Sequence, residues 1–183
     1  MSSIIDLRQK REELALTATA WHNLIHNQPP KIRAKDESET GIQVFVGLPD
    51  TNNFAFFPVG QPTGDISFAA ANRAVYSWLF RDMLSLDNDG PITIGHSASL
   101  IVDIEGLRIQ AAVAGLEYVE NIFIGAMLIA KAVKITPAKI FDHLSFRHEK
   151  FPECFREVGH YLHPYVTSMR VEDTAPPNIS VKR

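Results

Sequence analysis

Residues 97–133, SASLIVDIEGLRIQAAVAGLEYVENIFIGAMLIAKAV, change their hydrophobic period once, from two to about 3.6. Apolar side chains alternate with other side chains in 99–104 and again in 107–114, as half-buried antiparallel strands require. Glu105-Gly106 lies between the two runs and suits a tight hairpin turn, because Gly accepts a positive φ. After Gly115 the apolar residues recur at helical spacing. This stretch therefore predicts a β-hairpin followed by a helix.

The rest of the chain supplies the partners for this hairpin. The patterns predict a helix at 6–27 that begins with Asp6, strands at 41–48, 54–59 and 92–95, a helix at 66–85, and helical segments between 137 and 165 broken near 151–152. In the helix at 66–85 one face is defined by Phe68, Ala71, Val75, Trp78 and Asp82 and is widened by Ala74, Leu79 and Met83, and core packing is the default expectation for its aromatic residues. The element order predicts an α+β fold: a profilin-like antiparallel sheet with helices packed on it, plus extra C-terminal helices.

Length and composition bound the class of protein. With 183 residues and 45% hydrophobic residues, the chain is expected to form a single domain over 1–171 with a flexible tail at 172–183. The net charge of −3 argues against nucleic acid as a partner. The longest apolar run, 122–130, is too short to span a bilayer, so no membrane partner is expected. The single Cys154 and the polar, charged N-terminus favour a cytoplasmic protein.

Three short pieces of sequence suggest a family. The first is the pair of strands in 42–59 followed by Gly64-Asp65, and the second is the helical text AANRA at 70–74. The third is IQAAVAG at 109–115, followed by Glu120. Together these pieces resemble the GlcG/HbpS-like family of haem-binding and haem-degrading domains, over residues 10–135. The resemblance implies a profilin-like sheet that binds haem or another tetrapyrrole for storage or sensing.

The candidate ligand site lies where the start of the helix at 66–85 meets the loop that carries His96. Asp65 can cap that helix, whose N-terminal N–H groups favour an anion, and Arg73 can bond a carboxylate. Phe56, Phe57 and Phe68 are expected to supply apolar walls. Haem meets these requirements, with its propionates toward Arg73. The alternative for each residue is structural: a helix cap, a solvated cation and ordinary core aromatics.

His22 and His26 form a second candidate site, because a spacing of four residues places both rings on one face of a helix. They are predicted to bind a metal or to supply an axial haem ligand; the alternative is two packing or surface histidines. Among all the acidic and histidine side chains, no pair stands at a recognisable catalytic spacing, and no catalytic residue is predicted.

Two other functions remain open. The text IVDIEGLRI at 101–109 resembles the strand–turn–strand of roadblock domains, which implies a profilin- or roadblock-like oligomeric scaffold without ligand chemistry. A small-molecule enzyme that uses the loop around His96 is the second alternative. Apolar residues on both sides of the strands at 99–104 and 107–114 predict a homo-oligomer, unless further helices cover the second side.

Overall fold

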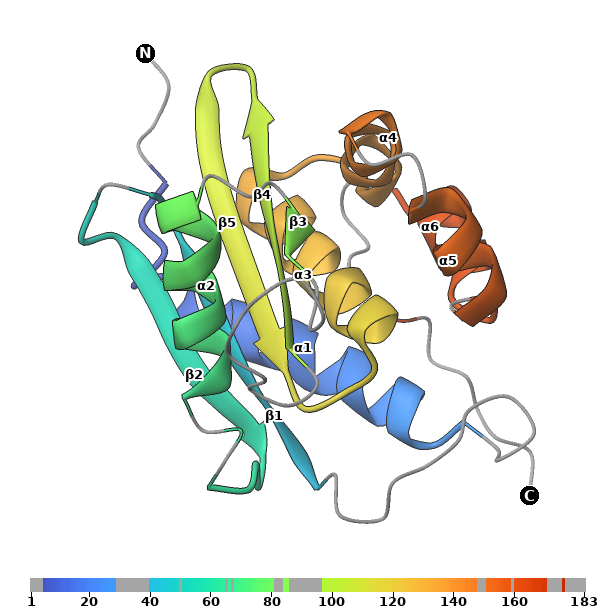
Figure 1. Cartoon of the computed structure of the whole chain (residues 1–183), viewed down its shortest axis with the longest axis horizontal. Helices are drawn as coiled ribbons and strands as arrows, with labels where there is room; N and C mark the ends of the chain where they lie inside the picture. Colours follow the sequence, from blue (N-terminus) through green and yellow to red (C-terminus); the bar gives the residue numbers. More distant parts are fainter. Residues whose placement is uncertain are drawn as a thin grey trace.

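Five strands form one antiparallel sheet in the computed structural model, in the order β2-β1-β5-β4-β3 (Figure 1). The strands are β1 Gly41–Gly47, β2 Phe54–Gly60, β3 Leu84–Ser85, β4 Ser97–Ile104 and β5 Leu107–Ala114. The helices are α1 Arg11–His26, α2 Ala69–Phe80, α3 Tyr118–Val133, α4 Pro137–Arg147, α5 Phe151–Val158 and α6 His163–Ser168. The structure describes residues 5–28, 40–49, 51–64, 66, 68–80, 84–85, 97–147, 151–158, 160–170 and 176.

Helices cover both faces of this sheet. α3 packs on β4 and β5 on one face, with α1 beside it, whereas α2 lies on the other face over β1, β5 and β4 (Figure 1). The predicted α+β architecture is therefore confirmed, including the hairpin of β4 and β5. Glu105 and Gly106 both have positive φ values, 52° and 81°, as a tight hairpin turn requires.

The main core lies between the sheet and α3. Alternate side chains of β1, β4 and β5 meet α3 there, and this face is lined by branched and aromatic residues. Four residues of β5 and α3 at this contact are fully buried: Ile109, Val113, Phe123 and Met127. The change of hydrophobic period after β5 thus identified the correct faces of both elements.

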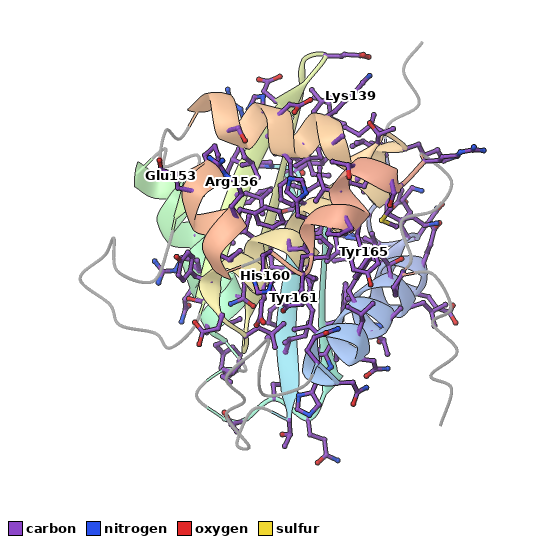
Figure 2. The ribbon with its side chains drawn as sticks, turned by 90° about the vertical axis from the view of Figure 1, so that its right-hand side faces the viewer. Lys139, Glu153, Arg156, His160, Tyr161 and Tyr165 are labelled. Carbon is purple, nitrogen blue, oxygen red and sulfur yellow. The ribbon has the colours of Figure 1, made fainter. Side chains whose placement is uncertain are left out.

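The C-terminal helices pack on the outer side of α3 and are tied to its first turn. The Glu117 N–H donates to Oε2 of the buried Glu120, which completes a capping box at the start of α3. The Tyr161 hydroxyl donates to the other carboxylate oxygen, Oε1, at 2.5 Å. On the same side of the molecule, Tyr165 reaches Trp21 of α1, with ring centroids 5.2 Å apart (Figure 2). These contacts make α4–α6 an integral further layer on the outer side of α3.

Several predicted elements differ from the structure. The helix predicted to run to residue 85 ends at Phe80, and Leu84 and Ser85 instead pair with β4 as an edge strand. Asp6 does not cap α1, which begins later, at Arg11; its carboxylate accepts from the Arg8 and Gln9 N–H groups of a preceding turn. The C-terminal helical region has three helices where two were expected. The predicted strand at 92–95 and nearly all of the tail at 172–183 lie outside the described residues.

Within the described parts of the chain, every helix is too short or too polar to cross a bilayer.

An ion pair between the two helices of the main face gives a pH-dependent prediction. Lys131 Nζ lies 3.2 Å from Glu13 Oε1. Burial raises the pKa of Glu13, but Lys131 and Lys10 outweigh it, so the pKa lies below 4.5. The stabilisation is therefore present above pH 4.5 and is lost as pH falls through the lowered pKa.

When pH falls through the pKa of Glu13, the free energy of unfolding measured in urea should therefore decrease less for the Glu13→Gln variant than for the parent. The difference should be at most about 1 kcal/mol, because exposed ion pairs are weak. Equal acid sensitivity of parent and variant would show that the pair does not contribute.

Candidate functional site

The face of the sheet beneath α2 is built from small side chains. Ala69, Ala70 and Ala74 on the inner side of α2 are buried against Ala112 and Ala114 of β5. Alanines on both surfaces let a helix approach a sheet closely, because neither surface has a long side chain to accommodate. This contact differs from the opposite face, where large apolar residues fill the space.

Buried polar groups hold α2 in one orientation. Arg73 Nε donates to Ser97 Oγ of β4 at 3.1 Å, and Gln110 Nε2 of β5 donates to the Ala74 carbonyl at 2.8 Å. Arg73, Ser97 and Gln110 are each at most 3% exposed. Breaking such buried bonds would leave polar groups unsatisfied, which is costly. The helix is thus fixed with Arg73 and its alanines inward.

The outer side of α2 is uncharged, and apolar side chains are exposed on it beside Asn72. Phe68, just before the helix, is 69% exposed, and Val75 is 57% exposed. In the sequence from 66 to 80 the single charged residue is Arg73, which points inward. A helix face in contact with water is normally polar or charged. The outward face of α2 therefore lacks the composition of a solvated helix.

Aromatic residues of β2 extend this apolar area on the same side of the sheet. Phe54 is 43% exposed, and Phe56 is half-buried and pairs across the strands with Phe45. The rings of Phe45 and Phe54 stack with centroids 5.8 Å apart. We refer to Phe54, Phe56, Phe68 and Val75 as the α2-side surface.

The structure separates some of the predicted ligand-site residues. Arg73 bonds Ser97, the residue directly after His96, so α2 and this end of the loop do meet. Phe68 does not face the same space, because it is exposed on the outside while Arg73 is buried beneath the helix. Asp65 and His96 themselves lie outside the described residues. Arg73 thus contacts the first residue of β4, and Phe68 does not share this contact.

The two histidines of α1 stack on each other. The ring centroids of His22 and His26 are 5.6 Å apart with an interplanar angle of 17°, and His22 is only 5% exposed. Among the residues that the structure describes, no group of three or more His, Cys, Asp or Glu side chains could hold a metal ion. The geometry is that of a stacked helical pair, and the metal prediction for these histidines rests on the sequence alone.

Sequence reasoning overlooked the buried polar residues and the exposure of Val75. Ser97 and Gln110 had a detectable signal, since polar residues recur on one side of the two central strands. Val75 had none, because an apolar residue on a helical stripe is ordinarily assigned to the core.

Comparisons with known proteins leave the chain without a family. No family model matches it, and no curated protein and no solved structure is significantly similar to it.

Proposed function

We propose that this protein is an assembly module that pairs with a second copy of itself through the α2-side surface. The observation that carries the proposal is the uncharged outer face of α2, with Phe68 and Val75 exposed. Large exposed apolar side chains that gather on one face of a protein mark interaction surfaces. This is the function of an oligomeric scaffold, which requires neither ligand binding nor catalysis by the chain.

The anchoring of α2 explains why this surface cannot be buried internally. Rolling the helix to hide Val75 would break the bonds of Arg73 to Ser97 and of Gln110 to the Ala74 carbonyl. It would also replace alanines with larger side chains at a close contact with β5. Covering the surface from outside is the arrangement that keeps both sets of interactions.

The outer face of α2 carries no charge, and this favours a second copy of the same chain as its partner. A charged partner would be recognised through complementary charges, which the outer face of α2 does not offer. Two identical uncharged faces meet without repulsion, and two-fold dimers are the commonest closed assembly.

Sedimentation at increasing concentration tests this proposal. The parent should sediment at twice the 20.4 kDa chain mass in the micromolar range, and Val75→Lys should sediment as a monomer, because a buried unpaired lysine is costly. Leu16→Lys is the matched control, since Leu16 is 69% exposed on α1. A parent that stays monomeric, or a Val75→Lys variant that dimerises as the parent does, would reject the proposal.

The second candidate function is binding of a hydrophobic anionic small molecule, with haem as the first ligand to test. The observation that favours it is the buried Arg73, bonded to the residue that follows His96. A guanidinium can form a charge-assisted bond to a carboxylate.

In an optical titration with haem, the parent should give a saturable Soret shift, and Arg73→Gln should weaken binding by about tenfold or more. Arg108→Gln is the control, because Arg108 is exposed and pairs with Asp103 on the hairpin. Circular dichroism must show that both variants fold. Saturable binding that is equal in parent and Arg73→Gln would exclude this site, and no binding by the parent would exclude the haem function.

A further inference from the structure

We propose that a groove at the turn of the β4–β5 hairpin binds a small zwitterionic molecule with an aliphatic body. The groove lies between the hairpin turn, the end of α3 and the segment that precedes α1, and its volume is about 780 Å³. Small-molecule sites commonly occupy about 300–1,000 Å³. This site is independent of the α2-side surface and does not depend on the proposed assembly.

The walls of the groove are formed by aliphatic side chains at the edge of the hydrophobic core. Six aliphatic residues that line it are only half-buried: Ile5, Leu48, Ile104, Leu107, Val133 and Ile135. All but Leu107 also contact the buried core cluster. The described residues that line the groove include no aromatic ring. An aliphatic chain fits such walls better than a planar ring, which gains most from stacking on other rings.

Two opposite charges stand at the rim. Glu105 in the hairpin turn and Lys134 at the end of α3 are both exposed and line the groove. Neither side chain bonds or pairs with any residue in the described part of the chain. The other two charged lining residues are engaged: the Asp6 carboxylate accepts backbone N–H groups, and Lys10 lies 3.6 Å from Glu13. The available rim charges are therefore one carboxylate and one ammonium.

The backbone at both residues is unusual. Glu105 and Lys134 have φ values of 52° and 58°, and they are the non-glycine residues with positive φ among those described. Asn, Asp or Gly is preferred at the turn position of Glu105. Lys134 is the left-handed C-cap of α3. The hairpin turn and the helix cap thus fix the backbone that carries the two available charges.

These features define the ligand by its chemistry. An ammonium group can meet Glu105, a carboxylate can meet Lys134, and the aliphatic body can extend from these two groups along the half-buried side chains of the groove. α-Aminooctanoate has this composition, whereas octanoate and octylamine each carry the same kind of chain with one charge only.

Isothermal titration of the full-length protein with these three probes tests the inference. The parent should bind α-aminooctanoate about fivefold more tightly than either singly charged probe, since an exposed ion pair contributes at most about this factor. Norleucine, the α-amino acid with two fewer methylenes, should bind about tenfold more weakly. Glu105→Gln should remove the advantage over octanoate, and Lys134→Gln should remove the advantage over octylamine.

Matched controls separate the groove from general surface charge. Glu153→Gln and Lys139→Gln remove the same charges from exposed residues of α5 and α4 that do not line the groove (Figure 2). Both should bind as the parent does. Leu107→Asp should abolish binding of all probes; if this variant does not fold, the two rim variants still decide the outcome.

Three results would overturn the inference: no saturable binding of α-aminooctanoate by the parent, equal affinity for the three probes, or rim variants that bind all probes as the parent does. None of these results bears on assembly through α2, which sedimentation measures separately.

Discussion

Replacing Phe123 by alanine is expected to lower the free energy of unfolding by about 3–5 kcal/mol, the range for a fully buried aromatic residue. Phe123 lies on α3 and is 0% exposed. Its ring centroid is 4.8 Å from Trp21 of α1, 6.1 Å from Phe141 of α4 and 6.4 Å from Phe155 of α5. Truncation leaves a cavity where four helices meet, so the C-terminal layer should loosen together with the core.

Urea unfolding, monitored by tryptophan fluorescence and by circular dichroism, measures this loss. Leu16→Ala serves as the control, because Leu16 is 69% exposed and its truncation should change stability by no more than about 0.5 kcal/mol. A loss below about 1 kcal/mol for Phe123→Ala would mean that this aromatic cluster does not hold the helices together.

Replacing Gly115 by alanine should cost at least about 2 kcal/mol, because two separate requirements exclude a side chain there. Gly115 follows β5 with a φ of +118°, which side chains rarely adopt. A Cβ atom would also lie 2.6 Å from the Gly41 carbonyl oxygen at the start of β1. Since that oxygen belongs to the backbone, relief of the clash would displace the strand.

The same substitution at Gly64 is the matched control. A Cβ atom at Gly64 would meet nothing within 4 Å. Gly64→Ala should therefore leave the unfolding free energy unchanged or raise it by up to about 1 kcal/mol, through the reduced entropy of the unfolded chain. Equal losses at the two glycines would contradict the close approach of β5 to β1.

The sequence predicted the central hairpin and α3 well because the apolar residues of each element recur at one regular spacing, two residues in the strands and about 3.6 in the helix. β5 was predicted at 107–114 and lies at Leu107–Ala114, and the helix expected after Gly115 is Tyr118–Val133. β3 was missed because a strand of two residues has no period of its own. Leu84 and Ser85 form a strand because they pair with Leu100 and Ser99 of β4, and the local sequence does not reveal this contact.

The orientation of α2 was the largest error. Phe68 and Val75 belong to one predicted face, for whose aromatic residues core packing was the default expectation, but both residues are exposed, and Arg73 with the alanines lies inside. Hydrophobicity alone favours the larger residues for burial. The actual choice follows from the opposing surface of β5, where Ala112 and Ala114 leave room only for small side chains. A single-helix pattern does not contain that information.

The candidate sites were predictable to different degrees. Arg73 was singled out as an isolated cation in an apolar helix, and it is indeed buried and bonded to a side chain next to the His96 loop. The groove at the hairpin turn was not foreseen, because Ile5, Ile104 and Ile135 belong to segments that are distant in sequence. The groove forms only when the fold brings the ends of several helices and strands together.

The contact between two copies of α2 can be measured directly by a pair of spin labels. Asn72 is exposed on the outer side of α2, and Thr19 is exposed on α1. In a Cys154→Ser background, Asn72→Cys carries the label and Thr19→Cys is the control. If two α2 helices pack with their axes about 8–10 Å apart, labels at position 72 should give a short, narrow intermolecular distance distribution. Labels at position 19 should give a longer one. A sample that sediments as a dimer without short-range coupling at position 72 would contradict assembly through α2.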